Sequence, residues 1–254
     1  VIDESYKILK KDKIPTPENE EKFLDSLSNI IQENLSKISK VSIAMPGYVD
    51  SANNKYLYGP HLQFGIDFYK LSNFTDYKFH LDNDGNVAAY CEYFLNYKNK
   101  YSNLIMLTFG TGVGGGIISE GRLLRGRGNA GEIGHMLTSN DRGVEGDSGK
   151  KGSFESSVAA SVWTKKCEEL AQKNKDSELA KIFAIKNVGS VLFDSKINLT
   201  NSEIAAREEI IQDISNGLLS LFEIFDNEAF VLGGTMSSEP FDLIELLYRD
   251  INSR

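Results

Sequence analysis

The stretch LTFGTGVGGGIISEGRLL, residues 107–124, decides the fold. It contains the pattern G-x-G-x-x-G between Gly110 and Gly115. A dinucleotide-binding fold needs a helix directly after these glycines, because the pyrophosphate rests on the N-terminus of that helix. Here the next residues alternate into a second strand through a Glu-Gly turn, which predicts a hairpin instead. The context therefore argues against a dinucleotide fold.

The density of glycine in this hairpin has two interpretations. Five glycines stand in seven positions, and each costs about 0.5–1 kcal/mol of backbone entropy in a strand. Such a density indicates that the backbone approaches something closely. Bare amide groups, with the Thr111 hydroxyl beside them, suit an anionic phosphate, whereas a glycine-rich hairpin without a ligand is the alternative. We favour a nucleotide-binding loop that belongs to an architecture other than the dinucleotide-binding fold.

The composition narrows the class of protein. The 254 residues carry a net charge of −8 and no basic stripe, which argues against nucleic-acid binding. Cys91 and Cys167 match neither a disulfide framework nor a metal motif. No apolar run reaches the roughly 20 residues of a membrane span, and no signal peptide is evident at the start. We expect a cytoplasmic protein with small-molecule partners, and neither a nucleic acid nor a membrane as partner.

Apolar periodicity predicts strands and helices that alternate along the chain. Strands are expected at 41–47, 78–82, 104–109, 117–124 and 229–234, and helices at 19–38, 86–97, 156–173, 176–185 and 203–225. A polar, glycine-containing loop is expected at 138–153. This order, with a hairpin among the elements, indicates an α/β fold.

Asn83 and Asp84 lie where the strand at 78–82 runs into a helix. An Asn-Asp pair at a helix start usually caps the free N–H groups of the first turn. Phosphoryl transfer to a hydroxyl, by contrast, needs a carboxylate that accepts the hydroxyl proton. Taken alone, the pair fits both roles.

Several motifs, in order, resemble one family. LDNDGNVAAYCEYF, GTGVGGGIISEGRLLRGRGNAGEIGHM and KGSFESSVAASVW are similar to the ROK family of bacterial sugar kinases, in the actin and hexokinase superfamily, as are AMPGYVD and VLGGTMS. The resemblance covers most of the chain. It implies a two-lobed actin/hexokinase-like (ribonuclease H-like) ATPase fold, with α/β lobes at 1–97 and 98–254 and a cleft between them. It also implies ATP and Mg²⁺ as cofactors, and a homodimer.

The resemblance also assigns roles to residues. Asp84 is implied to be the general base toward a C6 hydroxyl, a role worth about 10²–10⁴ in rate, while Asn83 fixes a neighbouring hydroxyl. The implied sugar-binding set is Gly47, Asn83, Asp84, Glu132, His135 and Glu155. The implied nucleotide-binding set is Gly110, Thr111, Gly112, Val113, Gly114, Gly115, Gly116, Gly233 and Gly234. The hydrogen-bonding groups of the sugar-binding set suit a polyol.

Glu132 and His135 also fit roles that need no sugar. Without the family pattern, Glu132 would be a solvated loop charge and His135 a hydrogen-bonded structural histidine. Their E-x-x-H spacing also occurs in carboxylate metal sites. The chain has no second E-x-x-H to complete such a site.

Two features depart from the family pattern. Most relatives hold a structural zinc through C-x-C-x4-C after the GEIGH histidine, where this chain has Glu145, Asp147 and Ser153. Acids and a serine do not replace thiolates, so we expect no zinc and a His135 that is oriented by hydrogen bonds. The chain given also starts after the family's first phosphate loop, D-x-G-G-T, and lacks its closing strand and helix. If it is complete, we expect sugar binding with little or no phosphoryl transfer.

Three functions follow from the resemblance. The first is ATP-dependent phosphorylation of the 6-hydroxyl of an N-acetylhexosamine or hexose, with N-acetylmannosamine in sialic acid catabolism as the nearest branch. A glucokinase of the same family is the rival. A non-catalytic sugar sensor is the alternative of another class, although the first 40 residues contain no basic recognition helix.

Overall fold

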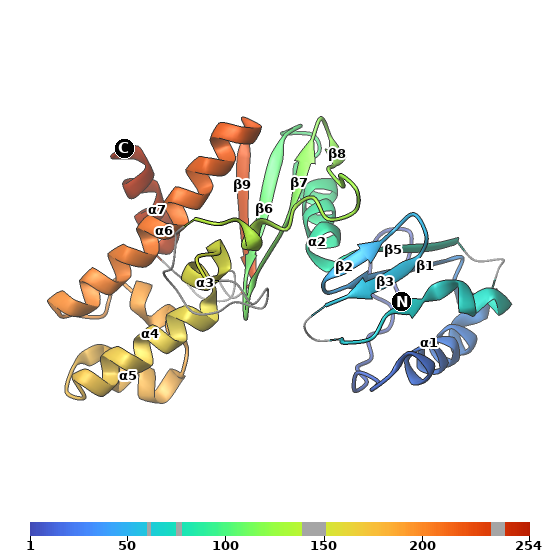
Figure 1. Cartoon of the computed structure of the whole chain (residues 1–254), viewed down its shortest axis with the longest axis horizontal. Helices are drawn as coiled ribbons and strands as arrows, with labels where there is room; N and C mark the ends of the chain where they lie inside the picture. The colour runs from blue at the N-terminus through green and yellow to red at the C-terminus, as the bar shows by residue number, and fades with distance from the viewer. Residues whose placement is uncertain (60–61, 75–77, 139–150, 235–241) are drawn as a thin grey trace. The chain divides into compact units, whose positions relative to one another are not determined.

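The computed structural model describes residues 1–254 apart from 60–61, 75–77, 139–150 and 235–241 (Figure 1). The chain forms two compact units, Val1–Asp84 and Gly85–Arg254. The sequence predicted a division near residue 97, whereas the contacts place it at Asp84. The helix after Asp84 packs with the second unit, because Ala89 lies directly against Gly116.

In its described residues, the first unit consists of two small sheets and one long helix. It contains α1 (Glu20–Asn34), β1 (Lys40–Met45), β2 (Tyr48–Asp50), β3 (Lys55–Tyr58), β4 (Ile66–Asp67) and β5 (Lys78–Asn83), with 3-10 turns at Leu35–Lys37 and Phe68–Phe74. β1 and β5 pair in parallel, and β2, β3 and β4 form a separate antiparallel sheet. The Asn19 side chain caps α1 by accepting the Lys22 N–H at 2.9 Å. Leu24 and Ile31 on the inner face of α1 join the core of this unit.

The second unit surrounds a four-stranded sheet. α2 (Asp84–Glu92) leads into it, and a π-helical turn at Tyr93–Tyr97 follows. The unit continues with β6 (Leu104–Phe109), β7 (Val113–Ser119), β8 (Arg122–Leu123), α3 (Phe154–Val158), α4 (Ala160–Lys173), α5 (Glu178–Lys186), α6 (Asn201–Phe225), β9 (Ala229–Gly234) and α7 (Leu243–Asn252), with 3-10 turns at Ile133–His135 and Gly189–Phe193. The strand order is β8-β7-β6-β9, with β7 antiparallel and β9 parallel to β6.

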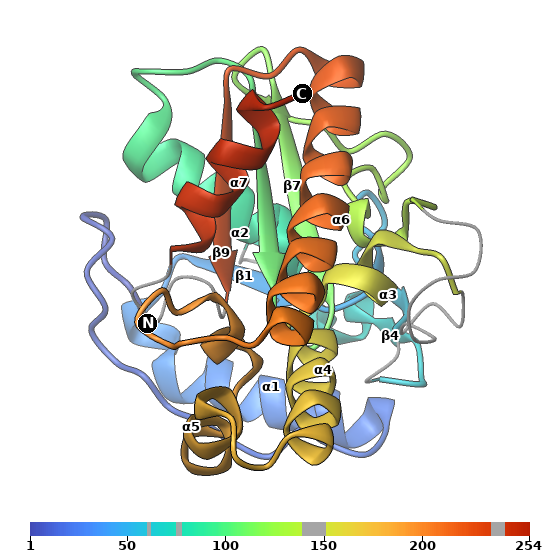
Figure 2. The same cartoon turned by 90° about the vertical axis from the view of Figure 1, so that its left-hand side faces the viewer.

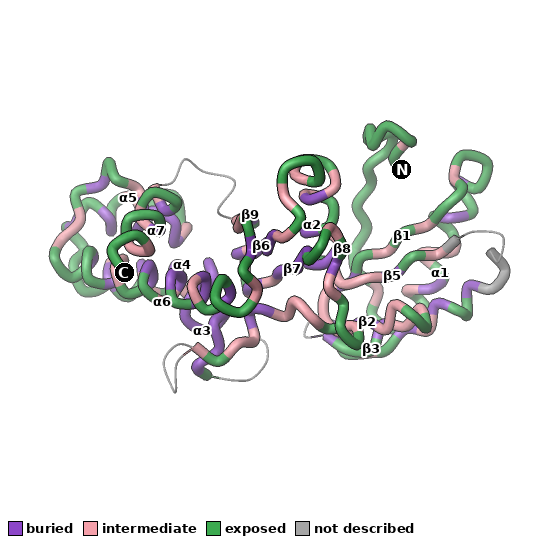
Figure 3. The backbone as a smooth tube through the Cα atoms, turned by 90° about the horizontal axis from the view of Figure 1, so that it is seen from above, coloured by how far each residue is buried: buried purple, intermediate pink, exposed green. Residues whose placement is uncertain are grey.

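Helices cover both faces of this sheet. α6 and α7 lie on one face and α2 on the other (Figures 1 and 2). Ile105, Leu107 and Phe109 of β6 join the large core that includes α6 and α7, whereas Leu104 packs with Tyr93. This alternation follows the two-residue period of a strand. Buried residues accordingly gather along β6 and β7 (Figure 3).

The structure confirms the predicted hairpin and corrects one predicted helix. The expected helix at 156–173 is two helices, α3 and α4, because Ala159 between them is extended with a ψ of 149°. The break allows both Phe154 and Trp163 to pack on Phe109, at ring distances of 6.5 Å and 6.0 Å. The sequence analysis also missed α7 and the small sheet of β2, β3 and β4. Among the described residues, no helix is long and apolar enough to cross a membrane.

Candidate active site

The glycine hairpin connects β6 and β7 through a tight turn. Phe109 lies opposite Val113, and between them the Gly110 N–H donates to the Gly112 carbonyl at 2.9 Å. We call residues 110–113 the tip of the hairpin and residues 114–116 its stem.

Stem and tip differ in what surrounds the glycines. A Cβ added at Gly116 would lie 2.5 Å from the Ala89 Cβ, and one added at Gly115 would lie 2.6 Å from the Met106 carbonyl oxygen. A Cβ added at Gly110 meets no described atom within 4 Å. The space beside the stem glycines is therefore filled by the protein itself, whereas no described atom fills the space beside Gly110.

The segment 155–161, which runs from α3 into α4, holds the tip. The Val113 N–H donates to Oε2 of Glu155 at 3.0 Å, and this carboxylate is buried. The Ser161 hydroxyl donates to the Thr111 carbonyl at 2.7 Å, and the Ser161 N–H donates to the Gly110 carbonyl at 3.4 Å. α3 begins at this place because the Ser153 side chain accepts the Ser156 N–H. The sequence analysis missed Ser161, although the residue lies within a motif that carries the family resemblance.

The turn at Ile133–His135 reaches the same tip. Gly134 lies so close to the Val113 carbonyl oxygen that any side chain there would collide with it. The Phe154 N–H donates to the Met136 carbonyl at 2.7 Å, which joins the end of this turn to the start of α3. This turn packs against β7 and α3, and it carries His135 at its end and Glu132 directly before it, both half-buried. Segments that carry three of the predicted sugar-binding residues therefore pack on Val113: α3 with Glu155, and the turn around Gly134 with Glu132 and His135.

The glycine pair of β9 lies at the same edge of the sheet. Gly233 is opposite Thr108, and Gly234 is opposite Phe109, directly before the tip. β6 and β9 are parallel neighbours that end at the same edge of the sheet, so the tip lies near Gly233 and Gly234.

The remaining predicted residues gather in the first unit. β1 and β5 end side by side, so the Asn83 side-chain amide donates to the Gly47 carbonyl at 3.0 Å. Gly47 has a φ of +96°, and a Cβ there would lie 2.5 Å from the Tyr58 carbonyl oxygen, so the position requires glycine. Asp84 follows as the exposed first residue of α2. Burial raises the pKa of Tyr56, and the charge of Asp84 contributes to the same shift.

A family model for the ROK family matches residues 1–253. The chain belongs to the ROK family. Among its relatives, a glucokinase of Streptomyces coelicolor is 28% identical over 94% of this chain and 78% of the relative. An N-acetylmannosamine kinase of Vibrio cholerae is 32% identical over 66% of this chain and 60% of the relative.

Solved structures of ROK proteins share the fold. A ROK family glucokinase from Streptomyces griseus, in complex with glucose and AMPPNP, matches with a TM-score of 0.77 and 25% identity, over 99% of this chain and 82% of that one. A ROK family transcriptional regulator matches with a TM-score of 0.73 at 19% identity, over 92% of this chain and 59% of that one. The actin/hexokinase-like α/β class predicted from the sequence is confirmed. The fold by itself does not separate kinases from regulators.

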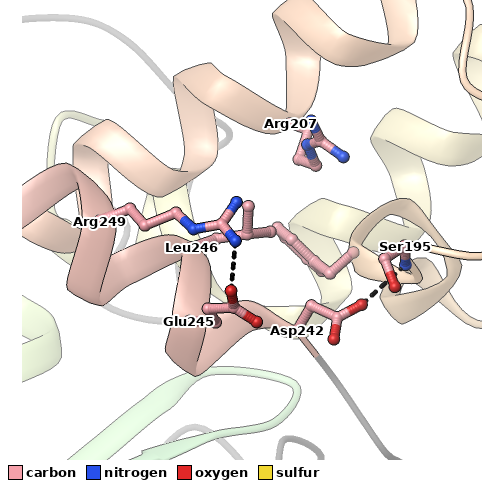
Figure 4. A pocket seen from close by; sticks show the side chains of 7 residues that line it. Ser195, Arg207, Asp242, Glu245, Leu246 and Arg249 are labelled. Carbon is pink, nitrogen blue, oxygen red and sulfur yellow. Dashed lines mark hydrogen bonds and ion pairs between the residues drawn. The ribbon is translucent and has the colours of Figure 1, made fainter.

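This ROK chain also has a pocket that the sequence analysis did not predict. It lies between α6, α7 and the segment after the turn at Gly189–Phe193 and has a volume of about 370 Å³ (Figure 4). Its lining residues are Phe193, Ser195, Arg207, Asp242, Glu245, Leu246 and Arg249. Nε of Arg207 is buried and has no hydrogen-bond partner among the described residues. Hydrogen bonds from Ser195 hold the pKa of Asp242 below its ordinary value.

The predicted loss of zinc concerns residues that are only partly described. Glu145 and Asp147 lie outside the described residues. Ser153 is buried and serves as the N-cap of α3. Within the described ranges, no group of three His, Cys, Asp or Glu side chains is arranged to hold a metal ion. The absence of zinc stays a prediction.

Proposed function

We propose that this chain, an ATP-dependent carbohydrate kinase of the ROK family, phosphorylates the 6-hydroxyl of an N-acetylhexosamine or hexose, with N-acetylmannosamine as the first candidate. One observation carries the proposal. The Glu155 carboxylate accepts the Val113 N–H at the tip of the hairpin, and Gly134, which lies between Glu132 and His135 in the sequence, packs against the Val113 carbonyl. Side chains that bind hydroxyls beside an accessible glycine backbone fit a sugar held next to a phosphate donor.

The chain's own residues divide the work between binding and proton transfer. Glu132, His135 and Glu155 bind and orient the sugar, since a site built to bond each hydroxyl rejects analogues that lack it. Asn83, bonded to the Gly47 carbonyl, fixes a hydroxyl next to the reacting one. The carboxylate of Asp84 accepts the proton of the 6-hydroxyl as that oxygen becomes the nucleophile. A carboxylate in the first turn of a helix also interacts favourably with the helix dipole.

The tip and the glycine pair fit a nucleotide. The open face at Gly110 is a place where a phosphate can approach the backbone without meeting a side chain. ATP would supply the phosphoryl group there, and Mg²⁺ would neutralise its charge. Gly233 and Gly234 hold the adenosine side at the neighbouring strand end.

The pocket beside α7 is our candidate for the purine base. Phe193 and Leu246 provide apolar walls, and Arg207, whose Nε is buried, provides a cation. A volume of about 370 Å³ is within the range of small-molecule pockets. Leu246→Ala should therefore raise KM for ATP and leave KM for the sugar unchanged. An equal rise in both constants would count against this assignment.

Two relatives suggest different substrates for this chain. The N-acetylmannosamine kinase has the higher identity, whereas the glucokinase matches more of the chain. ADP release with ATP and a panel of sugars, including N-acetylmannosamine, N-acetylglucosamine and glucose, names the substrate. Binding of a sugar without any ADP release would instead support the sensor, which the fold shared with a transcriptional regulator keeps as the second candidate.

The test of the mechanism is Asp84→Asn. We expect turnover to fall by about 10²–10⁴, because the general base is lost. Sugar affinity, measured by calorimetry, should stay close to the wild-type value. Asp176→Asn removes an exposed carboxylate from the loop before α5 and serves as the control. Unchanged turnover in Asp84→Asn would remove Asp84 from its role.

We also propose a homodimer. Phe222 and Ile224 are exposed near the end of α6, at 42% and 68%. Exposed large apolar side chains are candidates for subunit contacts. Sedimentation of the wild type and of Ile224→Glu tests this, since the variant should shift a dimer toward monomer. A monomeric wild type would contradict the proposal.

A further inference from the structure

Glu155 is the residue where the sugar side and the nucleotide side of the site meet. The family resemblance implies that Glu155 binds the sugar. In the structure its Oε2 oxygen accepts the N–H of Val113, 42 positions away in the sequence, and Val113 belongs to the tip. The side chain is only 6% exposed, so this hydrogen bond is shielded from water.

Gly112 is shaped around the same carboxylate. A Cβ added at Gly112 would run into Oε2 and the carboxyl carbon of Glu155. A Cβ added at Gly110, two residues earlier, meets nothing among the described atoms. Gly112 therefore lacks a side chain because Glu155 occupies the space, whereas Gly110 lacks one on the side open to a ligand.

Two further contacts support the tip from the same direction. Ser161, six residues after Glu155, donates its hydroxyl to the Thr111 carbonyl at 2.7 Å. Gly134, next to His135, lies against the Val113 carbonyl oxygen. Both peptide groups of Val113 are therefore held by segments that carry candidate sugar-binding residues. A change in Glu155 reaches the tip through one direct hydrogen bond.

We propose that Glu155 serves both ligands: it contacts the sugar, and through the Val113 N–H it is a positioning residue for the nucleotide-binding tip. This rests on the proposed function. Two consequences follow from it. Shortening Glu155 weakens nucleotide binding even when no sugar is present. Adding a methyl group at Gly112 weakens sugar binding even when no nucleotide is present, because the methyl displaces the carboxylate.

Calorimetry with AMPPNP alone and with the sugar alone tests both consequences. Glu155→Asp should raise Kd for AMPPNP by about 10-fold or more, because the shorter side chain no longer reaches Val113, an effect of the size of one hydrogen bond to a charged group. Glu155→Gln keeps an acceptor oxygen at the same distance, so it should bind AMPPNP like the wild type and lose only sugar affinity. Gly112→Ala should raise Kd for the sugar by a similar factor.

Two matched controls separate this role from general damage. Glu132→Gln should weaken sugar binding only, and Gly110→Ala should weaken AMPPNP binding only. If Glu155→Asp binds AMPPNP as well as the wild type, or if Gly112→Ala binds the sugar normally, the inference is wrong. If Glu155→Asp does not fold, Glu155→Gln and Gly112→Ala still decide the matter. A wild type that binds neither ligand would overturn the proposed function itself and the inference with it.

Discussion

The tip and the stem of the glycine hairpin contain the same residue type for opposite reasons. In the stem, Gly115 and Gly116 are covered by the Met106 backbone and by Ala89 of α2, so the missing side chains make room for the protein. At the tip, no described atom lies within 4 Å of a Cβ added at Gly110, so packing among the described residues does not account for this glycine. Gly112 belongs to the first kind although it lies at the tip, because Glu155 fills its space.

The glycines of the hairpin therefore meet two separate requirements, close packing within the protein and access for a ligand. Close packing of α2 on β7 explains the stem without any ligand. Access for an anion is our proposed reason for Gly110, the tip glycine whose added Cβ meets no described atom. Within this hairpin, the absence of a side chain therefore points to a ligand only at Gly110, where no described atom fills the space.

The largest expected effect lies in the stem. Gly116→Ala should lower the free energy of unfolding by about 1–3 kcal/mol, because the new methyl group overpacks against Ala89. Denaturant unfolding measures this loss. The double variant Gly116→Ala with Ala89→Gly should lose less than the sum of the two single losses, since the contact is removed. Additive losses would contradict this explanation, because they would show that Ala89 does not fill the space beside Gly116.

The next effect lies at the tip and concerns function. Gly110→Ala should change the free energy of unfolding by less than about 0.5 kcal/mol, because its Cβ meets no described atom. We expect KM for ATP to rise by about 10-fold, which corresponds to ~1.4 kcal/mol. KM for the sugar serves as the internal control and should not change. Loss of stability with normal ATP kinetics would show that the tip is packed like the stem.

A smaller effect is expected where α4 supports the tip. Ser161→Ala removes the hydrogen bond to the Thr111 carbonyl. Ser161 is exposed, so water partly replaces the lost donor and the cost stays near the low end of ~0.5–1.5 kcal/mol. We expect a rise of KM for ATP smaller than that of Gly110→Ala. Ser161→Thr retains the hydroxyl and should behave like the wild type, and equal effects in both variants would contradict the role of the hydroxyl.

The smallest effect concerns a thiol outside the hairpin, and it provides a baseline for tip and stem variants. Burial raises the pKa of Cys167 to about 12, whereas Cys91 is exposed. Near pH 8, a thiol reagent should label Cys91 alone in the folded protein and both cysteines after unfolding. The Cys167 contribution to stability is intact below the pKa of an unfolded thiol and is lost as the pH rises toward 12.

Labelling of Cys167 therefore reports loss of the second unit's core. Gly116→Ala should expose Cys167 to the reagent more often than Gly110→Ala does, because only the first variant strains the packing. A Cys91→Ser background makes the signal specific. Equal labelling rates in the two variants would remove the distinction between stem and tip.

Much of the fold followed from local pattern. The strand at 104–109, the hairpin and the helix at 203–225 were predicted correctly, because their periodicity is strong and their ends carry turn residues. The helix break at Ala159 was not predicted, since nothing in AAS disfavours a continuous helix. Tertiary packing determines the break at Ala159, because Phe154 and Trp163 both pack against Phe109.

By itself, the sequence determined the α/β alternation, the family and the set of candidate residues, because short-range spacing and motif order carry that information. The tertiary structure alone decided which partner each of these residues meets. Glu155 and Val113 are joined by a hydrogen bond, and Ala89 and Gly116 by contact, across long intervals of the chain. Such contacts form only when separate segments pack together, so no local pattern distinguishes a glycine that is covered from one that stays open.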